Sequence, residues 1–335
     1  MRAVVYSSQG PSDVLTLAER PLPEPGAGEV RVRLVRAGVN PTDWKARAGT
    51  TAPLAFPEVT PGQDGAGVVD ALGPGVVELA VGDRVWLYLA QHGRPYGTAA
   101  EYTTVPAGRA VRLPDAASFE LGASLGVPAI TAHRALTSGA VPRLAPAAFA
   151  GHTVLVQGGA GAVGNAAIQL ARWAGASVIT TVSSPQKAAL ARAAGAQHVV
   201  DYRATDAAAA VRALAPEGVD LIVEVAPAIN NAMDQAVVRS GGTIAFYANN
   251  GGEQLALDIR PTFGLNLRYQ GLLLYTLAPE HLDAATQDIT AAIAEGALRV
   301  GEDAGLPLHH FALAETAAAH DAVAGGAIGK VIIDL

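Results

Sequence analysis

The chain of 335 residues contains no cysteine, which excludes disulfides, thiolate catalysis and cysteine-ligated zinc or iron–sulfur sites. Only 16% of the residues are charged and half are hydrophobic, so the sequence is not that of a disordered protein. The apolar stretches are broken by glycine, proline or charge well before the length that spans a membrane, and the N-terminal residues lack the apolar core of a signal peptide. The net charge is −7 and no long basic run occurs, so a nucleic-acid partner is not expected. These absences predict a soluble, cytoplasmic protein without membrane contact.

The most informative feature that is present is a glycine-rich segment. Residues 154–156 form a short β-rich apolar run, glycines follow at 159, 161 and 164, and apolar residues then recur at helical spacing. Strand, glycine turn and helix are the context in which G-x-G-x-x-G binds a dinucleotide: the first glycine allows the turn, the second admits the pyrophosphate, and the third lets helix and strand pack closely. The alternative is an ordinary turn in a chain with 37 glycines. We predict a pyrophosphate site at a helix N-terminus, formed by Gly159, Ala160, Gly161, Ala162, Val163 and Gly164.

The pattern of secondary structure changes at about residue 128. Before it, residues 29–35, 67–72 and 83–87 read as strands divided by Gly and Pro turns. After it, predicted strands alternate with Ala-rich helical segments, which is typical of a parallel sheet with helices on both faces. These strands are 154–156, 177–182, 198–201, 219–224 and 242–247. One further helix is expected over about 279–295.

Short motifs stand along the whole chain besides the glycine loop. They are Ala37–Pro41, Pro61–Val69, Gly82–Val85, Ala100–Tyr102, Gly126–Pro128, Thr131–Leu136 and Gly329–Ile333. With these motifs the chain resembles the zinc-free quinone oxidoreductase branch, zeta-crystallin-like, of the medium-chain dehydrogenase/reductase superfamily. The resemblance implies an α/β protein with a GroES-like β domain and a Rossmann domain built on a doubly wound parallel sheet.

The same resemblance implies the domain boundaries and the quaternary state. The expected parts are a catalytic domain at 1–127, an NADPH-binding domain at 128–264 and a segment at 265–335 that completes the catalytic domain, with the active site in the cleft. A homodimer is expected, in which residues 242–247 and 267–275 lie near the joined sheet edges. Zinc-dependent relatives carry cysteine where this chain has Asn40 and histidine where it has Gln63, so no metal site is expected.

The choice of cofactor depends on the end of the second strand of the predicted Rossmann sheet. NAD enzymes place an acid there for the ribose 2′-hydroxyl, whereas this strand ends in hydroxyl residues, with Lys187 in the next helix turn. We expect Ser183 and Lys187 to bind a 2′-phosphate, and the family resemblance implies that Tyr202, after the third strand, lies near the same phosphate. NADPH is hence the expected cofactor. The alternative is that Ser184 caps a helix and Lys187 is a surface residue.

The reaction centre is assigned by resemblance. Asn40 to Lys45 are expected beside the nicotinamide ribose and the substrate, and Thr131 beneath the nicotinamide ring. The carboxamide end would meet the backbone of Tyr247, Ala248, Asn249, Asn250, Leu273, Leu274 and Tyr275. Lys45 stands where the family commonly has tyrosine. Its ammonium can stabilise the anion that hydride addition creates or contact the cofactor, but it can equally be a solvated lysine, as Asn40 can be a satisfied turn residue.

Three functions are considered. The first is zinc-independent hydride transfer from NADPH to a quinone, and the second is reduction of an enone, that is, an α,β-unsaturated carbonyl. Both use a small-molecule substrate and the same chemistry, in which the cofactor supplies the electronics and the protein supplies orientation. The third is a non-catalytic role, crystallin-like or nucleic-acid-binding, which the intact glycine loop and the acidic balance disfavour.

Overall fold

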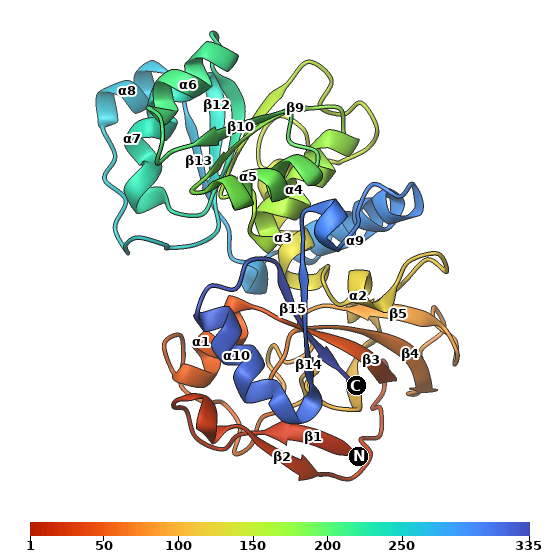
Figure 1. Ribbon diagram of the computed structural model, residues 1–335. Coiled ribbons are helices and arrows are strands. Elements are labelled where there is room, and N and C mark those ends of the chain that lie inside the picture. The colour runs from red at the N-terminus through yellow and green to blue at the C-terminus, as the bar shows by residue number, and fades with distance from the viewer. The chain divides into compact units, whose positions relative to one another are not determined.

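The computed structural model describes all 335 residues, which divide into two compact units. The first unit contains Met1–Val127 and Pro307–Leu335, and the second contains Pro128–Leu306 (Figure 1). Both units mix helices with sheets, so the predicted α/β class is confirmed. No helix combines the length and the apolarity needed to cross a bilayer.

The C-terminal boundary of the second unit differs from the expectation. Residues 265–306 were expected to complete the catalytic domain, but they belong to the second unit. The reason is that β13 (Arg268–Gly271) adds a strand to that unit's sheet and α9 (Pro279–Ala294) packs against its helix α4 (Ala162–Trp173). Only the residues from Pro307 onward return to the first unit.

The first unit is built on a seven-stranded sheet with the order β14-β15-β3-β4-β5-β7, in which β6 also pairs with β3. A separate two-stranded sheet joins β1 and β2. The strands are β1 (Arg2–Val5), β2 (Thr16–Glu19), β3 (Glu29–Val39), β4 (Asp64–Leu72), β5 (Arg84–Leu87), β6 (Tyr102–Pro106), β7 (Ala110–Arg112), β14 (Leu308–Ala312) and β15 (Lys330–Asp334). The helices are α1 (Pro41–Ala48), α2 (Phe119–Gly122) and α10 (Thr316–Ala324).

The long strand β3 organises this sheet. Its apolar residues alternate, so that Val30, Val32 and Leu34 enter the core cluster while the charged residues between them face outward. Irregular registers after Arg31 and Leu34 interrupt the pairing with β4. β3 pairs with β4 along most of its length, with β6 at Glu29–Arg33 and with β15 at Arg36–Val39.

The second unit contains a six-stranded parallel sheet with the order β10-β9-β8-β11-β12-β13. Its remaining strands are β8 (Thr153–Gln157), β9 (Ser177–Val182), β10 (His198–Asp201), β11 (Val219–Glu224) and β12 (Val238–Phe246). Its remaining helices are α3 (which begins in the first unit, Gly126–Leu136), α5 (Pro185–Ala193), α6 (Ala207–Leu214), α7 (Pro227–Val237) and α8 (Ile259–Gly264). The five predicted strands and the helix at 279–295 are confirmed, with ends shifted by a few residues.

Helices cover both faces of this sheet. Leu155, Ile179 and Ile222 point to the face where Val211 of α6 and Val237 of α7 complete a core cluster. Helices α4 and α5 contact β8, β9 and β10 and lie apart from α6 and α7 (Figure 1). The order of the strands reverses direction between β8 and β11. In doubly wound sheets, a ligand binds beyond the carboxyl ends of the two strands at such a point.

Candidate cofactor site and a buried polar cluster

The glycine loop joins β8 to α4, as the sequence predicts. Its left-handed residue is Gly158, with φ of 71°, so the assignment of the tight turn to Gly159 is wrong. A Cβ on Gly159 would lie 2.1 Å from Thr180 Oγ1, and one on Gly164 would lie 2.4 Å from the carbonyl oxygen of Gly158. Both glycines are therefore required by close packing within the protein.

Gly161 differs from its neighbours. A Cβ there would meet only the carbonyl oxygen of Gly158, at 3.5 Å, which is an ordinary contact. Gly161 is the N-cap of α4 and offers no side chain to the N–H groups of the first turn. The protein itself therefore leaves room at this position and leaves N–H groups uncapped. Both features fit a dinucleotide pyrophosphate.

The residues expected at the 2′-phosphate lie together at the ends of β9 and β10. Lys187 Nζ donates a hydrogen bond to Ser183 Oγ at 3.1 Å. The N–H of Tyr202 donates to the carbonyl of Val182 at 3.1 Å, which places Tyr202 beside the end of β9. Its side chain is 51% exposed. Ser184 also caps α5, accepting a bond from the N–H of Lys187 at 3.3 Å.

The two segments expected at the carboxamide end are neighbours in the structure. They follow β12 and β13, which pair in parallel, and the N–H of Leu272 donates to the carbonyl of Phe246 at 2.9 Å. Leu274 is buried, whereas Leu273, Asn249 and Asn250 are exposed. The backbone of Tyr247, Ala248 and Tyr275 continues these segments, and Thr131 lies on α3, nearly buried.

A buried carboxyl pair at the carboxyl end of β11 was missed by the sequence analysis. Gln157, the last residue of β8, donates to Asp234 Oδ1 at 2.9 Å, and Asn230 Nδ2 donates to Glu224 Oε1 at 3.1 Å. Burial, followed by the neighbouring Glu224, raises the pKa of Asp234 well above its usual range. The two residues form a buried acidic pair beside the strand that leads into the glycine loop. The sequence signal that could have indicated this pair is Glu224, an acid at the end of an apolar strand.

In the first unit, Lys45 lies on α1 and is half-buried. Its Nζ is 6.0 Å from the centre of the Trp44 ring, and no salt bridge joins it to an acid. The ammonium is therefore not committed to a partner in the protein. This arrangement is compatible with a ligand contact and with a solvated lysine.

Asn40 lies in a buried polar cluster that we define as Asn40, Asp43, Asp64 and Lys330. Lys330 Nζ donates to Asn40 Oδ1 at 2.7 Å and lies 3.5 Å from Asp64 Oδ2. Asn40 Nδ2 donates to Asp64 Oδ2 at 2.7 Å. The carboxamide of Asn40 is thus satisfied at both ends within the protein, and Asp64 and Lys330 were not identified from the sequence.

Asp43 is the titratable member of the cluster near neutral pH. It accepts a bond from the N–H of Asn40 at 2.7 Å. Burial and the neighbouring Asp64 raise the pKa of Asp43 to about 7. Asp64 accepts from Asn40 Nδ2 and from the N–H of Val127, at 2.8 Å. Burial raises the pKa of Asp64, while the nearby Lys330 and these two donors oppose the rise.

These residues do not fit a zinc ion. An ammonium contacts the amide at position 40, and Gln63 Nε2 donates to Gln91 Oε1 at 2.9 Å. No group of three or more His, Cys, Asp or Glu side chains is arranged to hold a metal. Zinc prefers thiolate, imidazole and carboxylate ligands, and an ammonium repels it.

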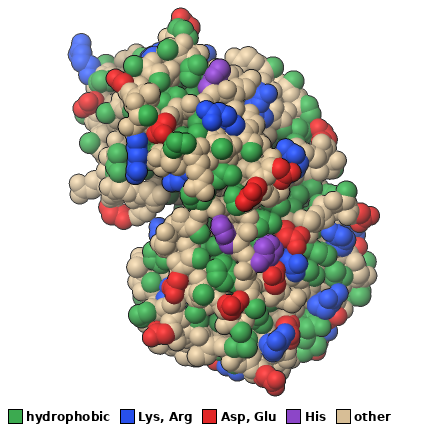
Figure 2. Space-filling view, viewed as in Figure 1, with side chains coloured by type: hydrophobic (Ala, Val, Ile, Leu, Met, Phe, Trp, Pro, Cys, Tyr) green, Lys and Arg blue, Asp and Glu red, His purple; other side chains and the backbone are tan.

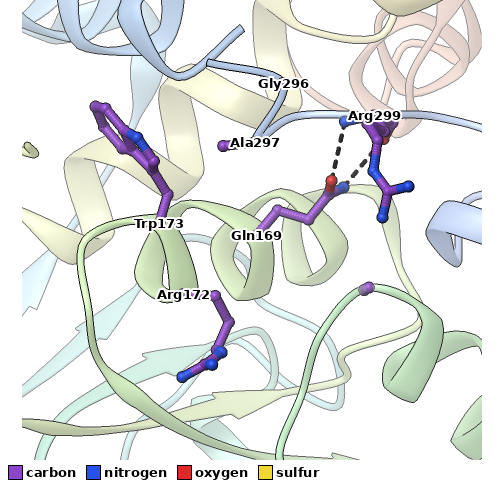
Figure 3. Close-up of a pocket in the computed structure, with 7 residues that line it drawn as sticks. Gln169, Arg172, Trp173, Gly296, Ala297 and Arg299 are labelled. Atoms are coloured by element: carbon purple, nitrogen blue, oxygen red, sulfur yellow. Dashed lines mark hydrogen bonds between the residues drawn. The ribbon is translucent and has the colours of Figure 1, made fainter. Parts of the chain in front are cut away.

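A surface cavity of about 410 Å³ lies at the other end of α4 from the glycine loop (Figure 3). Gln169 crosses its floor, where it bonds both the N–H and the carbonyl of Arg299, at 2.9 and 3.1 Å. Arg172 and Trp173 point away from each other at its rim (Figure 3). The cavity lies at the carboxyl end of the helix, so it is not part of the pyrophosphate site.

Comparison with known proteins agrees with this description. Residues 26–115 match the alcohol dehydrogenase GroES-like domain, and residues 162–291 match the zinc-binding dehydrogenase domain. A quinone oxidoreductase of Lama guanicoe is 30% identical over 99% of this chain and 97% of its own. An NAD-dependent alcohol dehydrogenase has a TM-score of 0.86 at 30% identity, with both chains fully covered. A mycobacterial protein solved in complex with NADPH has a TM-score of 0.84 at 29% identity, also with full coverage of both chains. The chain belongs to the quinone oxidoreductase branch of the medium-chain dehydrogenase/reductase superfamily.

Proposed function

We propose that this protein is an NADPH-dependent quinone oxidoreductase that needs no zinc. The observation that carries the proposal is the space above Gly161, where the protein leaves room for a phosphate between two tightly packed glycines. The family adds the acceptor class, since its members include enzymes that are named quinone oxidoreductases.

NADPH is proposed rather than NADH because of the groups at the end of β9. The side chains of Ser183 and Lys187 are hydrogen bonded there, the backbone N–H of Tyr202 is bonded to Val182 at the end of β9, and β9 ends without an acid. Carboxylates at this place select a free 2′-hydroxyl, whereas cations and hydroxyls suit a 2′-phosphate. The NADPH complex of the mycobacterial relative supports this choice. The NAD-dependent alcohol dehydrogenase makes NADH the alternative to be measured.

The reaction would add a hydride and a proton to a conjugated carbonyl. NADPH supplies the hydride when it is bound. The ammonium of Lys45 is proposed to stabilise the negative charge that develops on the acceptor oxygen, which is worth several kcal/mol in a water-poor site, typically about 3. Thr131 and the segments after β12 and β13 are proposed to orient the nicotinamide. Asn40 is proposed to belong to the buried cluster and not to contact the substrate, because both ends of its carboxamide are hydrogen bonded to Asp64 and Lys330.

A homodimer is proposed as the active form. Strand β13 is an edge strand. Ile259 and Phe263 on α8, which precedes it in the chain, are 73% and 60% exposed, and Leu273, which follows it, is 55% exposed. Pairing of two such edges would cover backbone groups and apolar surface together. Nucleic acid is not proposed as a partner, because acidic and basic side chains are interspersed on the face in Figure 2. The cytoplasm is proposed as the location, and the absence of cysteine means that the fold uses none of the disulfides that are typical of secreted proteins.

The test is steady-state turnover of the purified protein. We expect oxidation of NADPH with 1,4-benzoquinone or a naphthoquinone as acceptor, unchanged by a chelator and without stoichiometric zinc by elemental analysis. The same assay with an alkenal or an enone separates quinone reduction from the reduction of other conjugated carbonyls. NADPH binding without turnover on any of these acceptors would refute the enzymatic proposal.

A further inference from the structure

The buried cluster joins segments that lie far apart in the sequence. Asn40 follows β3, Asp64 begins β4, and Lys330 begins β15. The backbone is shaped around their side chains. A Cβ on Gly126 would lie 2.2 Å from Asp64 Oδ1. A Cβ on Gly38 would lie 2.0 Å from the carbonyl oxygen of Ala123 and 2.8 Å from Lys330 Cε. Gly126 therefore makes room for Asp64, and the backbone at Gly38 passes close to Lys330.

The ammonium of Lys330 is the cation of this interior. Lys330 and Asp64 are both buried, and their side chains face each other. Burial lowers the pKa of Lys330, whereas the neighbouring Asp64 and Asp43 raise it, and Lys330 Nζ lies 3.5 Å from Asp64 Oδ2 while it donates to Asn40. The side chain of Asn40 is thus held by a residue that comes from the other end of the chain.

Asn40 also starts helix α1. Its carbonyl accepts the N–H of Asp43 at 3.0 Å, and its N–H donates to Asp43 Oδ2. The other end of α1 is held separately, by Arg47 Nη1 on the carbonyl of Gly10 at 2.8 Å and by Gln9 Nε2 on the carbonyl of Ala46 at 2.9 Å. The bond from Lys330 to Asn40 is therefore a distinct anchor at the start of the helix that carries Lys45.

We infer that Lys330 is a positioning residue for the reaction: its ammonium fixes Asn40 and, through Asn40, sets the direction in which α1 presents Lys45. This rests on the proposed function insofar as Lys45 is taken to act on the acceptor. The anchoring of α1 by the ammonium does not depend on that function. The two parts can therefore be measured separately.

The experiment compares the wild type with Lys330→Met/Asp64→Asn, which removes both buried charges together and avoids leaving one of them unpaired. The matched control is Arg31→Met/Asp70→Asn, which removes the 2.7 Å ion pair between β3 and β4, away from α1. Amide hydrogen exchange across residues 41–48, the dissociation constant of NADPH, and kcat and KM for a quinone are measured for each protein. Asn40→Ala is the second variant, for use if the double variant does not fold, because it removes the anchor and keeps both charges.

The expected result has three parts. Exchange at 41–48 rises about tenfold or more, kcat falls about tenfold or more, and the dissociation constant of NADPH stays within about threefold, because a small displacement of a catalytic group is costly while the glycine loop lies in the second unit. The control variant changes none of these. Retained kcat, or lost kcat with unchanged exchange at 41–48, would overturn the inference. If the wild type itself turns over no acceptor, the proposed function fails, and the exchange measurement alone decides whether Lys330 anchors α1.

Discussion

Lys187 Nζ bonds Ser183 Oγ across the first turn of α5, so the only ammonium near the end of β9 is already directed toward the hydroxyls there. In doubly wound parallel sheets, the ribose 2′-hydroxyl of a bound dinucleotide lies near the end of this strand, and the pair occupies that end. A cation that is held in place loses little conformational entropy when it binds a phosphate.

Replacing this cation should change the cofactor preference. Lys187→Glu puts a negative charge near the 2′-phosphate and removes a charge-assisted bond worth about 1.5–3 kcal/mol. The ratio kcat/KM for NADPH should fall about 10- to 100-fold, while that for NADH changes little. Arg192→Glu, on the exposed far end of the same helix, is the charge-matched control. If kcat/KM for NADPH divided by kcat/KM for NADH is the same in the wild type and in Lys187→Glu, then Lys187 is a surface lysine.

The glycine loop gives a contrast between two variants. Gly161→Val should keep the fold and weaken NADPH binding by about 100-fold or more, because its Cβ meets no obstacle in the protein but its methyl groups occupy the phosphate space. Gly164→Val should lower the melting temperature instead, since its Cβ would lie 2.4 Å from the carbonyl of Gly158. Thermal melts and titration of cofactor fluorescence measure both effects. Tight NADPH binding by a folded Gly161→Val protein would place the cofactor elsewhere.

Asp43 should make the first unit less stable as the pH rises. Its folded pKa of about 7 exceeds that of an unfolded aspartate, so the folded state binds its proton more tightly. The resulting stability is fully present below about pH 4 and is lost as the pH rises through about 7, with an upper bound of about 4 kcal/mol. Unfolding by urea at pH 5 and pH 8 should show this loss in the wild type and a smaller one in Asp43→Asn. If the wild type and Asp43→Asn lose the same stability between pH 5 and pH 8, other groups cause the loss.

Asp288 should have the opposite effect, in the second unit. Burial alone would raise its pKa, but hydrogen bonds from His133 and Arg143 outweigh burial and hold the pKa of Asp288 well below its usual range. The stability from this carboxylate is present above about pH 4, where an unfolded aspartate is ionised, and is lost as the pH falls further. Thermal melts from pH 7 to pH 3 should show a steeper loss in the wild type than in Asp288→Asn. If the melting temperatures of the wild type and Asp288→Asn fall in parallel with pH, the hydrogen bonds to Asp288 contribute little to the pH dependence of stability.

The proposed dimer depends on apolar surface next to β13. Phe263→Glu, at a side chain that is 60% exposed, should produce monomers at micromolar concentration without lowering helix content. Leu17→Glu is a matched control on an exposed apolar residue of β2, in the first unit. Sedimentation velocity distinguishes the species. A wild-type protein that is already monomeric and fully active would exclude the dimer.

Local patterns were sufficient to predict the strands of the second unit and the glycine loop, because a buried parallel strand and a phosphate turn have strong short-range signatures. The extent of that unit was not predicted, because the pairing of β13 with β12 is a long-range contact with no local signal. The assignment of Gly161 to a ligand stays a prediction, and the left-handed residue proved to be Gly158, one position before the motif.

The buried cluster shows a similar limit. Asn40 was singled out because its position differs from that of zinc-dependent relatives, but its partners Asp64 and Lys330 are 24 and 290 residues away in the chain. Each was part of a motif that supported the family resemblance, yet a motif does not state which other motif it meets. Only the pairing of β15 with β3 in the folded sheet brings the ammonium of Lys330 to the carboxamide of Asn40.

The place of β15 in the chain also affects the order of synthesis. This strand lies between β14 and β3 in the sheet, but the ribosome makes it only after the whole second unit. The second unit, a continuous stretch of chain, can fold while translation proceeds, whereas the first must wait with the edge of β3 unpaired and Asp64 without its ammonium. Nascent chains stalled before residue 307 should therefore protect the second unit from protease and leave the N-terminal segment susceptible to cleavage.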